Sequence, residues 1–347
     1  MRGRLKNMRR MRFIFFILLL FILASCGSPG EDLTRGVISY ETRIVDAGEK
    51  LGQSPSLAFN SSGFPFISYY DEKDNSLKLA ELVRSEWVIT TVDTGVTPSI
   101  GSGGASISLA LDASGSPHIS YMDRDKGQLK LAVRNGTGGP NEMAWKVKVL
   151  DQGPNMGSWA SLKMDKEGRA HISYCYVRMD PQDPARVEEA YPKYLMYDGK
   201  TSPVPEVIDP ELVDAPLSGD THNLELTTSL VLAPDGTTLV SYYHPVRHSL
   251  NIARRLTGGG WAITIIDSAP DRSIGQSHSL AIDAQGTLHV SYTEMAPSGV
   301  SPYPCALKYA VYDGTQWHKE TVDAVKEELK GTGNSLTLGP DSSPIIS

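Results

Sequence analysis

Cysteine is scarce in this 347-residue chain, which contains only three: Cys26, Cys175 and Cys305. So few cysteines exclude a small disulfide-stapled fold. The sequence also lacks a glycine-rich phosphate loop, the His/Cys spacing of a zinc site and the nucleophile elbow of α/β-hydrolases. We therefore expect no metal ion and no cofactor. Cys175 and Cys305 fall in the third and fifth copies of a repeat described below, so a disulfide between them is doubtful.

The chain also lacks a hydrophobic run long enough to cross a membrane as a mature helix. The apolar run Phe13–Ala24 (FIFFILLLFILA) has twelve residues, whereas a spanning helix needs about 20. It follows Met1–Arg12, which carries six Lys/Arg and no acidic residue. Residues 1–25 therefore have the pattern of a cleaved signal peptide.

The signal peptide ends in Leu23-Ala24-Ser25-Cys26-Gly27. This stretch resembles the lipobox of bacterial lipoproteins, in which the cysteine is lipidated and becomes the new N-terminus. The resemblance implies a diacylglyceryl group, with acyl chains such as palmitate, on Cys26, followed by a tether over residues 26–36. It implies a protein of the bacterial cell envelope that is anchored in the lipid bilayer. By the same analogy, Gly27 favours the outer membrane if the organism has two membranes.

Positive charge is in short supply as well. The chain has 33 Lys/Arg against 40 Asp/Glu, and losing residues 1–25 removes six positive charges and no negative ones, which leaves a net charge of −13. Nucleic-acid binding requires a basic surface. We therefore expect no nucleic acid among the partners.

What the chain has instead is a repeat. Near-copies of one motif read PFISYYD (65–71), PHISYMD (117–123), AHISYCY (170–176), TLVSYYH (238–244), LHVSYTE (288–294) and a clipped PIIS (344–347). Their serines are 50 to 68 residues apart, a period that is too long for helical solenoids and typical of a four-stranded propeller blade. Alternating apolar residues and β-branched residues indicate strands throughout.

We predict an all-β fold: a β-propeller of six four-stranded antiparallel blades over residues 37–347. The blades span about 55–93, 106–151, 159–209, 228–267 and 278–323, and the sixth combines 334–347 with 37–46. Strands from both termini thus close the last blade. This blade is either three-stranded or completed by sequence beyond Ser347.

These repeats resemble the propellers of the sialidase-like superfamily, including bacterial-neuraminidase-repeat proteins. The resemblance implies the propeller fold. However, the sialidase Asp-box, Ser-x-Asp-x-Gly-x-x-Trp, is not reproduced, because residues 108–115 read Ser-x-x-x-Asp-x-x-Gly. That departure argues against sialidase activity.

The stretch SPHISYMD (116–123) contains the side-chain types of a hydrolase triad in His118, Ser120 and Asp123. The repeat favours a structural interpretation, because Phe66 and Leu239 occupy the position of His118 in other copies. A position that accepts both is a packing position.

Two further repeated positions also favour structural roles. The fourth strands end in an aspartate, which we expect to cap the following turn: Asp46, Asp93, Asp151, Asp209, Asp267 and Asp323. Tryptophans open several fourth strands, and we expect them to pack at the perimeter: Trp87, Trp145, Trp261 and Trp317.

Residues that break the repeat are better candidates for function, because the scaffold does not require them. The second strands end on one rim of the propeller in residues that differ from blade to blade: Asp71, Asp123, Tyr176, His244 and Glu294. Long insertions at 177–192, 210–227 and 295–305 lie on the same rim. Together they form either a polar ligand surface or simply solvated loops. Asp123 and Glu294 are weak catalytic candidates, since glycosidases place two carboxylates about one sugar.

From these features we predict an envelope lipoprotein whose propeller is a non-catalytic recognition or scaffolding module, with a glycan or an envelope protein as ligand. The alternative is a glycoside hydrolase or polysaccharide lyase of the sialidase-like superfamily. No catalytic residue is assigned by the sequence.

Overall fold

A computed structural model describes residues 42–97, 107–135, 144–183, 186–215, 217, 226–269, 271–296, 305–325 and 333–347. These ranges contain 22 strands and one short 3-10 helix, η1 (Pro210–Leu212). No helix within them has the length and apolar character needed to cross a membrane. The signal peptide and Cys26 lie outside the described residues.

The strands form five four-stranded sheets and one two-stranded sheet. Blade 1 contains β1 (Leu51–Phe59), β2 (Pro65–Asp71), β3 (Ser76–Val83) and β4 (Glu86–Thr94). Blade 2 contains β5 (Ile107–Leu111), β6 (Pro117–Asp123), β7 (Gln128–Asn135) and β8 (Ala144–Gln152). Blade 3 contains β9 (Ser158–Met164), β10 (Ala170–Met179), β11 (Val187–Tyr197) and β12 (Glu206–Val207).

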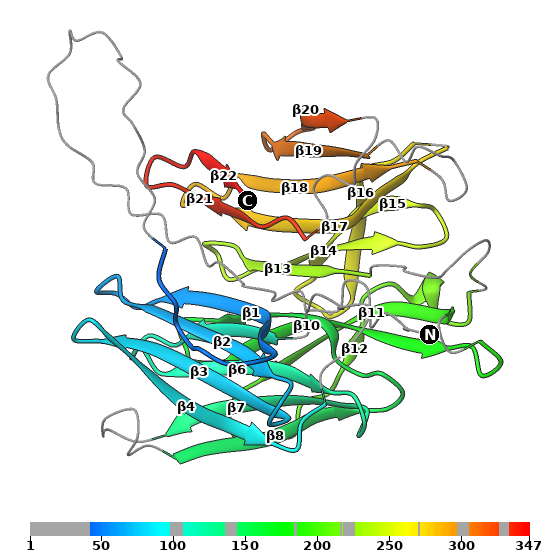
Figure 1. The fold of residues 1–347 in the computed structure, drawn as a ribbon. Coiled ribbons are helices and arrows are strands. Elements are labelled where there is room, and N and C mark those ends of the chain that lie inside the picture. Colours follow the sequence, from blue (N-terminus) through cyan, green and yellow to red (C-terminus); the bar gives the residue numbers. More distant parts are fainter. Residues whose placement is uncertain are drawn as a thin grey trace, which may run out of the picture.

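Blade 4 contains β13 (Thr228–Leu232), β14 (Thr238–His244), β15 (Ser249–Arg255) and β16 (Trp261–Asp267). Blade 5 contains β17 (Ser273–Ile282), β18 (Leu288–Met295), β19 (Cys305–Tyr312) and β20 (Trp317–Val325). The two-stranded sheet pairs β21 (Leu336–Leu338) with β22 (Pro344–Ile346). All pairings are antiparallel between strands that neighbour each other in sequence (Figure 1). The predicted all-β propeller is therefore confirmed.

The hairpin between the first and second strands is built the same way in blades 1, 2, 3 and 5. In blade 2 the carboxylate of Asp112 accepts the backbone N–H groups of Ser114 and Ser116, and Gly115 adopts a positive φ of 81°. An Asp or Asn that binds the backbone two residues ahead, followed by a residue that tolerates a left-handed conformation, specifies such a turn. The Asp-x-x-Gly pattern in the sequence thus encodes this hairpin.

The first strands form the inner ring, in which each contacts the first strand of the next blade, from β1 through β5, β9, β13 and β17 to β21. A serine on each strand accepts the backbone N–H of a leucine in the following blade. These bonds run from Leu109 to Ser56, from Leu162 to Ser108, from Leu230 to Ser161 and from Leu280 to Ser229, at 3.0–3.1 Å. The same leucines are buried between blades, so the ring is held by both apolar packing and backbone hydrogen bonds.

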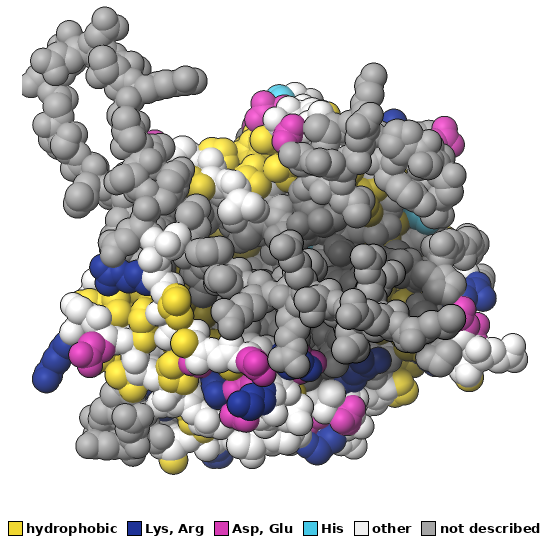
Figure 2. All heavy atoms as spheres, viewed as in Figure 1, with side chains coloured by type: hydrophobic (Ala, Val, Ile, Leu, Met, Phe, Trp, Pro, Cys, Tyr) yellow, Lys and Arg dark blue, Asp and Glu magenta, His cyan; other side chains and the backbone are white. Residues whose placement is uncertain are grey.

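Leu57 breaks this pattern. It stands at the same position in β1, yet 45% of its surface is exposed, whereas Leu336 in β21 is 7% exposed. Phe59 and Phe64 of the same hairpin are also about half exposed, and hydrophobic side chains gather over the sheet of β1–β4 (Figure 2). No described strand covers this face of blade 1, where the predicted composite blade would pack.

The structure also corrects two details of the expected strands. Much of the 177–192 insertion is strand rather than loop, since β10 runs to Met179 and β11 starts at Val187. The fourth strand of blade 3, which we expected to end in Asp209, is only the two-residue β12, because Asp209 caps η1 through a hydrogen bond from the N–H of Glu211. Cys175 and Cys305 are both buried and are not joined to each other by a disulfide.

The four fourth-strand tryptophans pack as expected against the sheets. Trp145, Trp261 and Trp317 each lie on a buried apolar cluster between blades, and Trp87 lies on a smaller cluster within blade 1. They therefore belong to the packing of the perimeter.

Candidate functional site

A tyrosine–aspartate hydrogen bond joins neighbouring blades at the rim where the second strands end. The second-strand tyrosine donates to the aspartate at the end of the preceding fourth strand, at 2.5–2.7 Å: Tyr69 to Asp46, Tyr121 to Asp93, Tyr174 to Asp151, Tyr242 to Asp209 and Tyr292 to Asp267. Burial first, and the neighbouring aspartate second, raises the pKa of each tyrosine. The tyrosines therefore stay protonated and donate.

The expected capping role is confirmed for Asp93, Asp151, Asp209 and Asp267, each of which accepts a backbone N–H just after it in the chain. In Asp93 and Asp151 one carboxylate oxygen accepts the N–H of the next residue, while the other accepts the tyrosine hydroxyl of the next blade. One side chain thus fixes both the turn and the junction.

The predicted rim acids belong to these same junctions. Asp123 is fully buried, and its carboxylate lies 2.8 Å from the ammonium groups of Lys126 and Lys130. Lys130 also reaches Asp93 at 3.3 Å. Burial raises the pKa of Asp123, but the hydrogen bonds from the two lysines outweigh it and lower the pKa below the ordinary value. Asp123 is therefore a charged structural group.

Asp71 and Glu294 have corresponding lysine partners. Asp71 is 2% exposed and pairs with Lys78 at 2.5 Å. Glu294 is partly exposed and pairs with Lys308 at 2.9 Å, and Lys308 also reaches Asp267 at 3.2 Å. Asp123 and Glu294 are thus each held by a lysine of their own blade.

Blade 4 replaces this ionic arrangement with a neutral one. His244 stands where blades 1, 2 and 5 have an acid, and Asn251 stands where the other blades have the lysine. The ring of His244 accepts the N–H of Arg247 and lies 3.8 Å from Asp209, while Asn251 donates to the hydroxyl of Tyr242. Burial lowers the pKa of His244, so it is neutral. Acid and lysine are lost together, which keeps the net charge of the junction unchanged.

Blade 3 differs again. Lys193 pairs with Asp151 at 2.6 Å, but Tyr176 occupies the place of the acid and stacks on Tyr191 with ring centres 4.7 Å apart. Both rings are partly exposed. Of the five predicted rim residues, Tyr176 is therefore the one that presents an aromatic surface rather than a junction.

The Asp123–Gly127 turn, which partly resembles a calcium loop, has lysines where a cation would sit. Within the described ranges, no three His, Cys, Asp or Glu side chains are gathered so as to hold a metal ion.

Trp159 on the inner strand β9 is a feature that the sequence analysis missed. Its φ is 49°, a left-handed conformation that is strained for a bulky side chain. Ser54 and Gly333 occupy the same position in their repeats and share this conformation, with φ of 51° and 70°. The bulge is thus a property of the repeat, whereas the indole is peculiar to blade 3. The hydroxyl of Thr228 fixes the bulge by donating to the carbonyl of Trp159 at 2.8 Å.

A polar network adjoins Trp159. The indole is partly exposed and packs on an apolar cluster that includes Tyr243. The hydroxyl of Tyr243 lies 2.8 Å from Nδ1 of His248 and 2.7 Å from the hydroxyl of Ser273, to which Gln276 also donates. Burial raises the pKa of Tyr243, so its hydroxyl keeps its proton, which it donates to Ser273, while the hydroxyl oxygen accepts the N–H of His248 Nδ1 and so orients the ring.

His248 differs from the buried histidines of the repeat because it is exposed. One ring nitrogen is held by Tyr243, which leaves Nε2 available for proton transfer. A site that acts on a sugar polymer combines an aromatic side chain that packs on the sugar with an oriented histidine and with hydroxyl and amide groups. The side chains around Trp159 include all of these. The sequence carried one signal for it: Trp159 is the only tryptophan of five that does not open a fourth strand.

Comparison with known proteins gives the fold but no family. No family model matches the chain, and no curated protein matches it. Solved structures with this fold include an α-L-arabinanase from Penicillium chrysogenum, at 11% identity and a TM-score of 0.45, with 84% of this chain and 86% of that chain covered. An α-L-arabinofuranosidase from Fusarium graminearum has 12% identity, a TM-score of 0.43 and coverage of 84% and 85%. The polysaccharide lyase Uly1 has 13% identity and a TM-score of 0.43, with coverage of 85% and 64%.

These neighbours require one correction. They are named as glycoside hydrolases and a polysaccharide lyase, which contradicts the prediction of a non-catalytic module and our preference for a chain that is not an enzyme. At this level of identity their likeness concerns the fold, and the chemistry must be argued from the residues of this chain.

Proposed function

We propose that this protein is an enzyme that cleaves a polysaccharide, and that its active site lies beside Trp159 at the inner ring. The observation that carries the proposal is the partly exposed Trp159, which packs on the cluster of Tyr243, together with the exposed His248, which the hydroxyl of Tyr243 orients. The backbone bulge is shared with other repeats, but the indole and the imidazole are not, so the repeat does not require these two side chains. The sialidase-like resemblance is, on this proposal, one of fold rather than of reaction.

The side chains favour β-elimination over hydrolysis. Glycosidases need two carboxylates on one sugar, but Asp71, Asp123 and Glu294 are each neutralised by a lysine. A histidine with a free ring nitrogen is instead suited to removing the proton next to the carboxylate of a uronate. The electrons of that C–H bond form the new C=C bond, and the glycosidic oxygen leaves and takes up a proton.

The test is an assay of the purified protein against polygalacturonate and a neutral polysaccharide, with products analysed by mass spectrometry and ultraviolet absorbance. Lyase action yields an unsaturated, ultraviolet-absorbing product from the uronate polymer alone. Hydrolysis, which adds water and leaves no double bond, would overturn the elimination step. No cleavage of any uronate-containing polymer would overturn the proposal of a polysaccharide lyase.

We also propose that Cys26 anchors the protein in the envelope, which would hold the site near polymers outside the cell. The support is the lipobox-like sequence at 23–27. Cys26→Ser is expected to abolish metabolic labelling with palmitate and to leave an unprocessed, heavier band. A variant that keeps both the mature size and the membrane association would contradict the anchor.

A further inference from the structure

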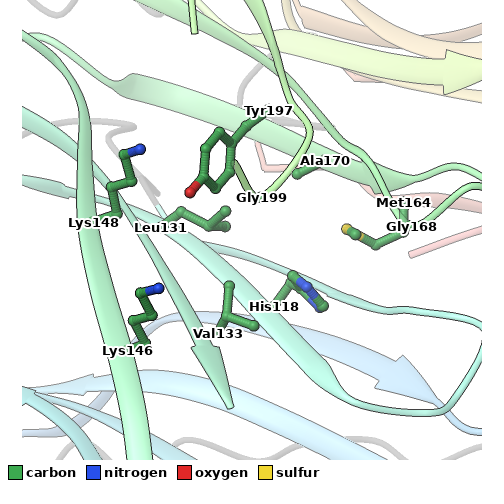
Figure 3. A pocket seen from close by; sticks show the side chains of 10 residues that line it. All are labelled: His118, Leu131, Val133, Lys146, Lys148, Met164, Gly168, Ala170, Tyr197 and Gly199. Carbon is green, nitrogen blue, oxygen red and sulfur yellow. The ribbon is translucent and has the colours of Figure 1, made fainter. Parts of the chain in front are cut away.

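We propose that a pocket between blades 2 and 3 binds a small cyclic carboxylate that also carries a hydroxyl group. The pocket has a volume of about 140 Å³. It is lined from blade 2 by His118, Leu131, Val133, Lys146 and Lys148, and from blade 3 by Tyr197 among others (Figure 3). A cavity of about 150 Å³ is known to accommodate one six-membered ring, so the size suits a single ring.

This pocket is separate from the candidate active site. His118 stands near the start of β6, Lys146 and Lys148 near the start of β8, and Tyr197 at the end of β11. Asp123 and the other rim residues lie at the opposite ends of these strands, where the second strands finish. The pocket is therefore not part of the rim, and the inference does not depend on the proposed reaction.

The positive charge of the pocket favours an anionic ligand. Lys146 and Lys148 are two residues apart on β8, so their side chains project from the same face of the strand, and both line the pocket (Figure 3). Neither forms an ion pair with any residue in the described ranges. The ammonium of Lys148 lies 4.6 Å from the ring centre of Tyr197, which holds it at the wall. Two unpaired ammonium groups at one mouth suit a carboxylate.

The apolar walls of the pocket favour a ligand that contains a ring. Leu131, Val133 and the aromatic face of Tyr197 supply apolar surface, and small-molecule pockets combine such surface with a few polar groups that set orientation. The two glycines of the lining, Gly168 and Gly199, have no side chains that would narrow it.

His118 supplies the acceptor for a hydroxyl group. Its Nδ1 lies 3.1 Å from the carbonyl oxygen of Ser116, and because a carbonyl only accepts, Nδ1 carries the proton. Burial lowers the pKa of His118, so the ring is neutral and its Nε2 is an acceptor. In the other blades this position is filled by Phe66, by Leu239, or by His171 and His289, whose Nδ1 atoms bond tyrosine hydroxyls at 2.7 and 2.5 Å. His118 has no such partner within its own blade, because Leu131 on β7 takes the place of these tyrosines.

Two sources share this ligand chemistry: a uronic acid monosaccharide and a hydroxylated aromatic acid. Titration calorimetry of the full-length mature chain with D-glucuronate and with 4-hydroxybenzoate distinguishes them. Glucose and phenol are the uncharged counterparts. We expect one of the two carboxylates to bind, and its uncharged counterpart to bind at least about tenfold more weakly, as loss of a charge-assisted hydrogen bond predicts.

The double variant Lys146→Met/Lys148→Met is expected to lose about tenfold or more in affinity for that carboxylate. The control Lys73→Met removes an exposed lysine between β2 and β3 of blade 1, away from the pocket. It should bind the carboxylate as tightly as the wild type does. His118→Leu reproduces the side chain found in blade 4 and should weaken binding of the hydroxylated acid but not of its deoxy analogue. Binding of neither carboxylate, or equal binding by the double lysine variant, would overturn the proposal. Both lysines are on the surface, so the double variant tests the pocket without disturbing the core.

Discussion

At the four junctions between blades 1 and 5, an aspartate binds the backbone that follows it and the tyrosine of the next blade. The bond from Tyr121 to Asp93 shows the principle, because a buried hydroxyl donates to a charged oxygen over 2.6 Å. A hydrogen bond to a charged group in such a place contributes about 1.5–3 kcal/mol. The rim therefore derives its rigidity from residues that, in the sequence alone, resembled a ligand site.

We expect Tyr121→Phe to lower the free energy of unfolding by about 2 kcal/mol, because Asp93 loses its short hydrogen bond from the buried hydroxyl and keeps only the longer contact with Lys130 on that oxygen. Urea denaturation measures the change. The matched control is Tyr312→Phe, since the hydroxyl of Tyr312 has no hydrogen bond within the described ranges. Tyr312→Phe should lower the free energy of unfolding by less than about 0.5 kcal/mol. Equal losses in the two variants would mean that the junction bond contributes nothing.

Buried histidines make stability depend on pH. His278 donates to the carbonyl of Gly275 at 2.9 Å, and burial lowers its pKa from 6.5 to about 4. The unfolded chain takes up this proton first as the pH falls, so stability is complete above pH 6.5 and is lost between 6.5 and 4. This loss is on the order of 3 kcal/mol.

His278→Asn keeps a donor for Gly275 and removes the titration. We expect its unfolding free energy to fall less than that of the wild type between pH 7 and pH 4. The curve should be flatter but not flat, because burial also lowers the pKa of His118, His171 and His244. His318→Asn, at an exposed position, is the control. A His278→Asn variant whose unfolding free energy depends on pH as that of the wild type does would contradict the assignment of this pH dependence to His278.

Strands and hairpins are the scale at which the sequence predicted best. The second-strand motifs at 65–71, 117–123 and 238–244 coincide with β2, β6 and β14, because alternation and turn residues are local signals. The junctions were not predictable in the same way. The partner of Tyr121 lies 28 residues earlier in the chain, and its identity depends on how the blades stack.

Trp159 shows the same limit. A single-residue bulge reverses which face a side chain occupies, and nothing local in Ser158-Trp159-Ala160 announces it. The repeat does indicate that Trp159 is unusual, but the strained conformation and the neighbouring Tyr243 become visible only in the fold.

Close approach between blades also acts at this scale. Gly275 in the bulge of β17 has a φ of 88°, and a Cβ there would lie 2.7 Å from the side chain of Leu250. Gly314 has a similar φ of 97° but nothing within 4 Å. Gly314→Ala should lower the free energy of unfolding by about 1 kcal/mol through backbone strain alone. Gly275→Ala should lower it clearly more, because the added Cβ also meets Leu250. Thermal or urea unfolding compares the two, and equal costs would show that the blades can move apart freely.

The whole molecule raises the question of ring closure. Asp46 accepts a hydrogen bond from Tyr69 as the fourth-strand aspartates of the complete blades do, and β21 contacts β17. These contacts support the proposal that terminal strands form a sixth, composite blade. The exposed Leu57 marks the face that this blade would cover.

If the N-terminal strand is docked in this way, Asp46→Ala should lower the unfolding free energy by about 2 kcal/mol, because the buried hydroxyl of Tyr69 loses its acceptor. Glu49→Ala, which removes an exposed acid three residues later, should leave stability within about 0.5 kcal/mol of the wild type. An Asp46→Ala variant as stable as the control would contradict the composite blade.

The central claim is that a site built on Trp159 and His248 cleaves polysaccharide, and one comparison tests it directly. The rate of formation of unsaturated product from polygalacturonate or another uronate polymer is measured for the wild type, His248→Gln and Trp159→Ser, the last reproducing the residue of blade 1. Trp87→Phe, a change at the perimeter, is the control. The account predicts that His248→Gln lowers kcat by about 100-fold or more, that Trp159→Ser mainly raises KM, and that all three variants stay folded. Full activity in both site variants would contradict it.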